Sequence, residues 1–276
     1  MANLGLIASA DYLFHMLFDP LYLSGVGNYW KTIAVSLVGH ILLLRVTPVI
    51  SEFLLPQTYG GFNKSDKEAW GVSVTALIHS AFDACFIIGY FNNHELNNDK
   101  MDGYNECFEF YLAIALGYYV WDMSICLYNF SNYGFMYLIH AGLGVFGLLI
   151  LTSRQLQFYA IPFLLPELSS VFLHIRHLMK YAGYSKSLIY KINFLLFLIT
   201  YIVIRIGFEA YHSLLLVMDV YNEHTGNVFF PYAVFFSMLG VTLTVLNCIW
   251  LRQILNAAYY TLYPTSFKIK KNTKTN

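Results

Sequence analysis

Residues 193–217 read NFLLFLITYIVIRIGFEAYHSLLLV, a run of 25 residues in which apolar side chains dominate. A helix needs about 20 such residues to cross the hydrocarbon core of a bilayer. Within the run, Arg205, Glu209 and His212 follow one another at spacings of four and three, so a helix places them on one face. The run therefore predicts a membrane-spanning helix that carries a polar stripe.

Apolar runs of similar length recur along the rest of the chain. Hydrophobic residues make up 58% of its 276 residues and charged residues only 12%, against roughly 25% charged in soluble domains. The other runs are 29–50, 70–92, 107–128, 135–151, 156–179 and 229–251. We therefore predict an all-α fold, a polytopic membrane helical bundle of about seven transmembrane helices around a central cavity. The net charge is zero, so no nucleic-acid partner is expected.

The segments outside these runs predict the domain organisation and the orientation. Residues 1–28 predict an interfacial or luminal segment or, as the alternative, one extra span. Residues 29–262 predict the bundle, and residues 263–276 predict a cytosolic basic tail.

The basic residues predict the orientation of the bundle, because cytoplasmic loops are enriched in Lys and Arg. A luminal N-terminus places nine lysines on the cytosolic side and three basic residues on the luminal side. The cytosolic set is Lys64, Lys67, Lys180, Lys186, Lys191, Lys268, Lys270, Lys271 and Lys274, and the opposite set is Lys31, Lys100 and Arg154.

Ionisable side chains recur inside the predicted spans. Each costs at least about 2.5 kcal/mol near the bilayer centre, so each needs a partner or a function. Besides the stripe on 193–217, the polar residues are His79, Asp83, Asp122, His140, Glu167, Ser170 and His174. A rise of about 1.5 Å per residue places many of them in the middle and cytosolic half of the bundle. They therefore predict a polar cavity that opens toward the cytosol.

Each of these groups also has a structural interpretation. Arg205 and Glu209 could neutralise each other as an ion pair, and His79 with Asp83 could form a satisfied core contact. Arg176 and His177 lie near a helix end and could extend to the cytosolic interface. The number of polar groups at similar depth, rather than any single residue, favours the cavity.

Five motifs follow one another on successive predicted spans: LIHSAFDACFIIGYF (77–91), GYYVWDM (117–123), FMYLIHAGLG (135–144), LLPELSSVFLHIRH (164–177) and FLLFLITYIVIRI (194–206). This ordered set resembles the TLC-domain family, the superfamily that includes the ceramide synthases, and most closely its small TLC-domain-only members. The resemblance implies a TLC domain over about 70–262. It also implies a multi-pass protein of an internal membrane, usually the endoplasmic reticulum, and a role with lipids.

For catalysis, the resemblance implies transfer of a fatty acyl group from acyl-CoA to a long-chain base amine, a step of sphingolipid metabolism. Ceramide synthases carry paired His residues on the fourth span, whereas here His140 is followed by Ala141. Amide formation needs a base for the amine and a second group at the thioester carbonyl. The catalytic candidates are therefore His140 with Asp122 or His79, and whether the protein is an enzyme stays undecided.

Three hypotheses follow for the function. The first is a role in lipid homeostasis, in which the protein binds, senses or redistributes a lipid in its cavity. The second is an acyl-CoA-dependent N-acyltransferase, in which Lys180, Lys186 and Lys191 contact the CoA phosphates, although the orientation rule also accounts for these lysines. The third is a membrane metallohydrolase, suggested by the ExxH spacing of 209–212 and the HxxH spacing of 174–177.

No cofactor and no metal-ligand set are assigned. Membrane lipids are the expected partners, and a homo-oligomer is left open.

Overall fold

The computed structural model describes residues 2–21, 23–222 and 230–262, and its regular elements are all helical. Six helices in this part of the chain are long and apolar enough to cross a membrane: α2 (Ser24–Leu54), α4 (Lys64–Tyr90), α6 (Glu106–Tyr128), α9 with α10 (Gln157–Tyr181), α11 with α12 (Leu188–Asn222) and α13 (Phe230–Leu262). A seventh apolar helix, α8 (Phe135–Leu151), has 17 residues. The predicted all-α polytopic bundle of about seven helices is confirmed, with six long spans and the shorter α8.

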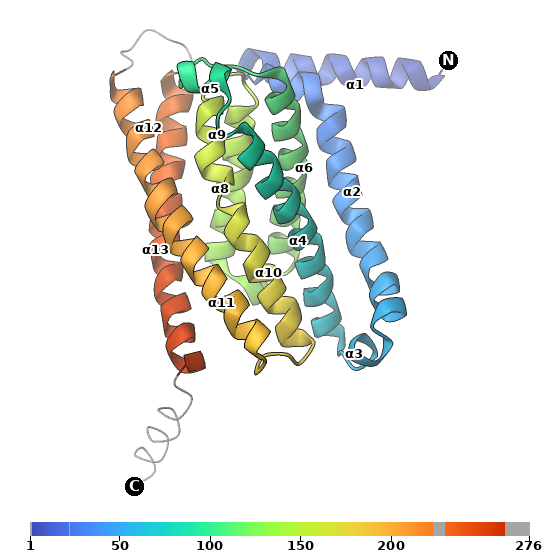
Figure 1. Cartoon of the computed structure of the whole chain (residues 1–276). Helices are drawn as coiled ribbons and strands as arrows, with labels where there is room; N and C mark the ends of the chain where they lie inside the picture. Colours follow the sequence, from blue (N-terminus) through green and yellow to red (C-terminus); the bar gives the residue numbers. More distant parts are fainter. Residues whose placement is uncertain (1, 22, 223–229, 263–276) are drawn as a thin grey trace.

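Helix α1 (Ala2–Phe18) lies across one end of the bundle, whereas the long helices run side by side (Figure 1). The Phe14 and Trp30 rings stack with their centroids 4.9 Å apart. The Asp11 carboxylate accepts hydrogen bonds from Trp30 Nε1 at 2.7 Å and from Lys31 Nζ at 3.0 Å. These bonds, the Lys31 contact first, hold the pKa of Asp11 below its ordinary value. These contacts fix α1 against the start of α2, and the interfacial location of residues 1–28 stays a prediction.

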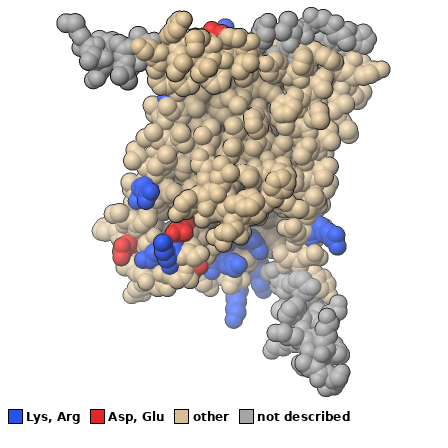
Figure 2. Space-filling view, turned by 180° about the vertical axis from the view of Figure 1, so that it is seen from behind, with Lys and Arg blue, Asp and Glu red and all other residues tan. Residues whose placement is uncertain are grey.

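Short helices connect the long ones at both ends of the bundle. At the end that carries α1 lie a 3₁₀ turn (Asp19–Leu21) and α5 (His94–Asn98). At the other end lie α3 (Pro56–Gly60) and α7 (Phe130–Tyr133). The sequence places Lys64, Lys67, Lys180, Lys186 and Lys191 at this second end, and Figure 2 shows Lys and Arg side chains gathered there. We call it the basic end; the predicted basic tail 263–276 lies outside the described residues.

Two of the spans are interrupted at the same level of the bundle. Helix α9 (Gln157–Leu164) is separated from α10 (Glu167–Tyr181) by two residues, Leu165 and Pro166. The span of α11 (Leu188–Thr200) and α12 (Ala210–Asn222) contains a π-helical segment, Tyr201–Glu209. Such widened turns are rare and often mark functional sites. A hydrogen bond from Arg205 Nη2 to the Pro166 carbonyl, 3.2 Å long, joins the two interruptions.

The outer helix α2 packs against α6 at close range. Ser36 Oγ donates to the carbonyl of Ile114 at 2.6 Å, and a Cβ on Gly117 would lie 2.6 Å from the carbonyl oxygen of Ile33. Small residues at such crossings let the backbones of membrane helices approach each other.

The hydrophobic core lies further inside, between α6, α8 and α9. It is rich in aromatic residues and includes Phe108, Tyr111, Trp121, Leu148 and Tyr159.

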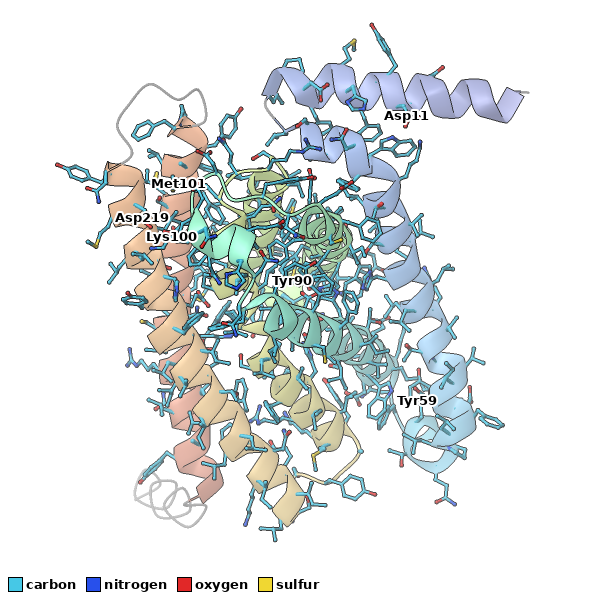
Figure 3. The ribbon with its side chains drawn as sticks, turned by 45° about the horizontal axis from the view of Figure 1, so that its top comes forward. Asp11, Tyr59, Tyr90, Lys100, Met101 and Asp219 are labelled. Carbon is cyan, nitrogen blue, oxygen red and sulfur yellow. The ribbon has the colours of Figure 1, made fainter. Side chains whose placement is uncertain are left out.

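Polar contacts fix the connections at the α1 end. Figure 3 shows Lys100 and Met101 beside Asp219 of α12. Lys100 Nζ lies 3.6 Å from the Asp219 carboxylate, which also accepts a hydrogen bond from the Tyr159 hydroxyl. Arg154 Nε lies 3.5 Å from the buried carboxylate of Glu109. These contacts join the connecting segments at the α1 end, whereas a cavity lies inside the basic half of the bundle.

Candidate functional site: a polar cavity at the basic end

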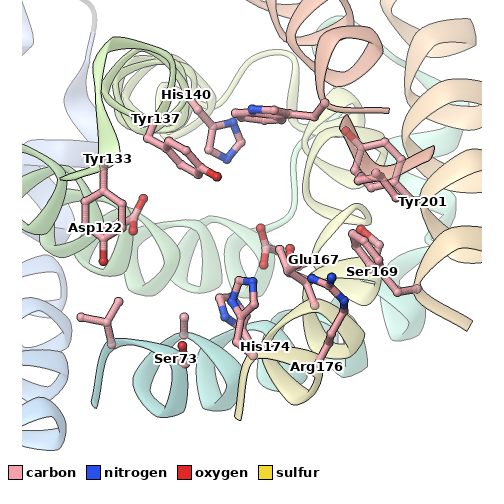
Figure 4. Close-up of a pocket in the computed structure, with 18 of the residues that line it drawn as sticks. Ser73, Asp122, Tyr133, Tyr137, His140, Glu167, Ser169, His174, Arg176 and Tyr201 are labelled. Carbon is pink, nitrogen blue, oxygen red and sulfur yellow. The ribbon is translucent and has the colours of Figure 1, made fainter. Parts of the chain in front are cut away.

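A cavity of about 530 Å³ lies inside the basic half of the bundle, between α4, α6, α8, α10, α11 and α13 (Figure 4). Its volume falls within the range of about 300–1,000 Å³ that is usual for small-molecule sites. Six of the polar residues that the sequence singled out line it: Asp122, His140, Glu167, Ser170, His174 and Arg205. The structure therefore brings together side chains from four spans, in a cavity that reaches the basic end at Lys180 and Tyr181.

The deep wall of the cavity holds a carboxylate and a guanidinium among neutral hydrogen-bond partners. Glu167 accepts a hydrogen bond from Ser80 Oγ at 2.6 Å and one from the Tyr119 hydroxyl at 3.3 Å. Arg205 Nε donates to Ser169 Oγ, and its Nη2 donates to Ser170 Oγ, each at 2.9 Å. Both charged groups are fixed in position because their partners belong to neighbouring helices.

His140 and Asp122 lie on other walls of the cavity. The edge of the His140 ring faces Trp250 of α13 at a centroid distance of 5.2 Å. Its Nδ1 is buried and has no hydrogen-bond partner among the described residues. Asp122 lies beside Tyr133 (Figure 4). Burial raises the pKa of Tyr133 to about 12, so this phenol remains a neutral donor at physiological pH.

One face of α10 supplies the outer wall. His174, Arg176, His177 and Lys180 all line the cavity there. Arg176 and His177 are half-buried in this wall, near the end of α10. The Arg176 guanidinium lies over the ring of Phe194, 4.7 Å from its centroid.

His79 and Asp83 do not line the cavity. His79 Nε2 lies 3.0 Å from Asp83 Oδ2, and both side chains are almost completely buried. The Tyr118 ring stacks on His79 at a centroid distance of 3.5 Å, and Tyr118 itself lines the cavity. The pair therefore lies behind an aromatic wall, as a buried core contact between an imidazole and a carboxyl group.

Glu209 and His212 also lie outside the cavity lining. Glu209 accepts a hydrogen bond from Asn247 Nδ2 at 2.8 Å, and the His212 Nδ1 contacts the Phe208 carbonyl at 2.9 Å. The ion pair between Arg205 and Glu209 is not formed, since Arg205 is held by Ser169, Ser170 and Pro166 instead. The polar stripe of residues 193–217 therefore divides, and of its three ionisable residues only Arg205 lines the cavity.

The two spacings that suggested a metal site do not converge. His174 and His177 belong to the cavity wall, whereas Glu209 and His212 have partners elsewhere. Within the described ranges, no three His, Cys, Asp or Glu side chains are grouped so that they could hold a metal ion.

A narrow apolar pocket continues from the deep wall of the cavity. It has a volume of about 50 Å³ and shares Tyr119, His140, Glu167 and Arg205 with the cavity. We call it the apolar slot. Its remaining lining comes from α8, α9, α13 and the turn at Pro166, and comprises Leu143, Gly144, Gly147, Leu148, Leu151, Phe163, Leu164, Pro166, Phe236, Leu239, Gly240 and Leu243. A polar chamber and an apolar slot thus meet at one group of residues.

Comparison with known proteins identifies this architecture. Residues 69–256 match the TLC domain. The chain belongs to the TLC-domain family. A TLC domain-containing protein of Schizosaccharomyces pombe is 24% identical and matches 87% of this chain and 82% of its own length. TLC domain-containing protein 4-B of Xenopus laevis is 24% identical, with 87% and 94% coverage, and TLC domain-containing protein 2 of Danio rerio is 27% identical, with 54% and 62%.

The family match confirms the resemblance drawn from the motifs, and the family is associated with lipid metabolism. The TLC domain begins in α4 and ends in α13, so it contains almost the whole cavity lining, from Ala69 to Ala257. Helices α1 and α2 precede it along the chain. The cavity is therefore a property of the TLC domain itself.

Sequence reasoning missed the aromatic part of the site. Tyr119, Tyr201 and Trp250 line the cavity but were not distinguished from the many other aromatic residues. A spacing signal was available for two of them. Tyr119 precedes Asp122 by three residues and Tyr201 precedes Arg205 by four, so each shares a helical face with a charged residue.

Proposed function

We propose that this TLC-domain protein acts in lipid homeostasis by binding, sensing or redistributing a lipid in its intramembrane cavity. The observation that carries the proposal is the junction of a polar cavity with an apolar slot at Tyr119, His140, Glu167 and Arg205. A membrane lipid has the same two-part chemistry, and ligand pockets combine apolar walls with a few fixed polar groups.

We further propose that the protein is a multi-pass protein of the endoplasmic reticulum, with its N-terminus luminal and its C-terminus cytosolic. The lysines of the basic end support this orientation through the positive-inside rule. In this orientation the cavity opens toward the cytosolic leaflet. A lipid could then enter with its headgroup at the basic end and one chain directed into the slot.

Blocking the slot tests the proposal. Gly147 lines the slot, and a Cβ on it would lie 3.4 Å from the Phe236 ring, so the longer side chain of Gly147→Leu would occupy the space meant for a lipid chain. Overpacking of this kind costs about 1–3 kcal/mol. We therefore expect the lipid that co-purifies with the protein, measured by mass spectrometry per mole of chain, to fall about tenfold.

Gly142→Leu provides the matched control on the same helix. Gly142 lines neither pocket, and no atom lies within 4 Å of a Cβ built on it. This variant should retain as much lipid as the wild type. Equal lipid content in the Gly147→Leu and wild-type proteins would contradict binding in the slot.

N-acyl transfer is a second candidate function because His140, Asp122 and Glu167 line one cavity. The unbonded Nδ1 of His140 is a suitable acceptor for a proton from an attacking amine. Ala141, in the place of a second histidine, is buried and offers no acid–base group. Any second catalytic role would thus fall to Asp122 or Glu167.

The expected result for an acyltransferase is amide formation from acyl-CoA and a long-chain base, measured by product mass spectrometry. His140→Ala should then lower the rate at least about 100-fold. His212→Ala is the control, since His212 lies outside the cavity. Absence of product from the wild type, or full activity in His140→Ala, would rule out this mechanism.

A further inference from the structure

The basic face of α10 lies where the cavity meets the membrane surface. Arg176, His177 and Lys180 line the cavity, and α10 ends at Tyr181. With a rise of about 1.5 Å per residue, Arg176 lies about 8 Å from the end of the helix. The three cationic or protonatable groups are therefore close to the depth of lipid headgroups.

This face carries charge that the protein does not neutralise locally. Among the described residues, no carboxylate oxygen lies within 4.0 Å of Arg176, His177 or Lys180. Arg176 Nε is buried without a hydrogen-bond partner in this part of the chain, and the same holds for Nδ1 of His174, two residues deeper on α10. An arginine N–H is always a donor, and buried donors are nearly always satisfied, so Arg176 indicates a ligand that brings acceptor oxygens.

The carboxylates of the cavity lie elsewhere on its walls. Asp122 is on α6, beside Tyr133 (Figure 4). Glu167 is at the start of α10, nine residues before Arg176 and so about 14 Å deeper, where it accepts hydrogen bonds from Ser80 and Tyr119. The outer part of α10 is thus a positive region separated from the deep acidic group.

The Arg176 side chain is also held in a fixed orientation. Its guanidinium carbon lies 4.7 Å from the centre of the Phe194 ring and 5.7 Å from that of Tyr190. An arginine that merely extends to water would leave the wall. A stacked guanidinium instead presents its fork of donors in one direction, which suits the oxygens of a phosphate.

We infer that the face formed by Arg176, His177 and Lys180 binds the phosphate of a membrane-lipid headgroup. This inference rests on the proposed lipid-binding function and specifies its ligand as a phospholipid rather than an uncharged lipid. The phosphate stays at headgroup depth on α10, while the rest of the molecule passes Asp122 and His140 and one chain enters the apolar slot.

A pair of lipids that differ only in the phosphate tests the inference. The full-length protein in detergent is titrated with dioleoylphosphatidate and with dioleoylglycerol, and bound lipid is measured by native mass spectrometry. We expect the wild type to bind the phosphatidate at least about tenfold more tightly, since hydrogen bonds to charged groups each contribute about 1.5–3 kcal/mol. Arg176→Gln and Lys180→Gln should each remove about tenfold of phosphatidate affinity and leave dioleoylglycerol binding within about twofold.

Arg252→Gln is the matched control for the loss of one positive charge. Arg252 is exposed on α13 and does not line the cavity, so phosphatidate affinity should stay within about twofold of the wild type. Lys180→Gln keeps the experiment decisive if Arg176→Gln folds poorly, because Lys180 is exposed at the cavity mouth.

The other outcomes separate the two proposals. Equal wild-type affinity for both lipids, or unchanged phosphatidate binding in both α10 variants, would overturn the phosphate site and leave lipid binding intact. Failure of the wild type to bind either lipid would overturn both. Displacement of phosphatidate by free coenzyme A at equal concentration would assign the site to a soluble phosphate compound and overturn the headgroup assignment.

Discussion

Gly25→Ala is expected to prevent α2 from docking at the α1 end and to destabilise the protein strongly. A Cβ at this position would lie 1.6 Å from the carbonyl oxygen of Thr152 and 2.7 Å from Glu109 Oε1. Overpacking commonly costs 1–3 kcal/mol and sometimes more, and here the nearest atom belongs to the backbone. We expect a loss of about 3 kcal/mol or more, which would lower the midpoint of thermal unfolding by roughly 10 °C.

The turn that contains Thr152 has little freedom to move away. The Thr152 amide donates to the Leu148 carbonyl at 3.0 Å, and the Leu156 amide donates to the Met101 carbonyl at 2.8 Å. Arg154 and Leu156 have φ values of 70° and 61°, in the left-handed backbone region that residues other than glycine rarely adopt. The surroundings therefore already hold this backbone in a strained conformation, and a shift would disturb contacts on both sides.

Gly39→Ala on the same helix is the control. No atom lies within 4 Å of a Cβ built on Gly39, and alanine favours a helix interior over glycine by up to about 1 kcal/mol. The control should unfold at the wild-type midpoint or slightly above it, as measured by size-exclusion chromatography of heated detergent samples. Identical midpoints for Gly25→Ala and Gly39→Ala would contradict the close approach of α2 and the α8–α9 turn.

The spans were the predictable part of this fold because the thickness of the bilayer fixes their length. The run 135–151 coincides with α8 residue for residue. The run 29–50 lies inside α2, which extends from Ser24 to Leu54. The two extensions, 24–28 and 51–54, contain Ser, Gly, Asn and Glu beside only three apolar residues, so hydropathy does not mark them as helical. Element type was therefore predictable, whereas the ends of α2 were not.

The polar stripe of residues 193–217 shows why four of the ten predicted site residues, His79, Asp83, Glu209 and His212, do not line the cavity. A buried charge needs a partner, and the bilayer cost of the charge does not say which. Arg205 finds its partners at the α9–α10 junction and faces the cavity, whereas Glu209 finds Asn247 of α13. The π-helical segment that contains both residues depends on tertiary contacts as well. The sequence of one span therefore predicts neither the partners of Arg205 and Glu209 nor the π-helical segment.

His79→Leu should be among the most destabilising single changes in the bundle. It leaves the completely buried carboxylate of Asp83 without the imidazole that lies 3.0 Å away. A buried polar group that is left without its partner typically costs about 1–3 kcal/mol, and more where it is charged, because it stays desolvated. The measurement is the free energy of unfolding in mixed micelles, relative to the wild type.

The double variant His79→Leu with Asp83→Val should recover most of that loss. Replacement of a buried pair by apolar residues of similar volume is often neutral or stabilising, and a double-mutant cycle isolates the interaction energy.

A stable double variant also distinguishes a core role of His79 from a functional one, since the sequence placed His79 among the catalytic candidates. A core role predicts normal lipid retention, since Tyr118 stands between the pair and the cavity. Loss of lipid or of amide product in a stable double variant would instead make His79 a positioning residue that acts through Tyr118. A double variant as unstable as His79→Leu alone would show that the pair is not what the core requires at these positions.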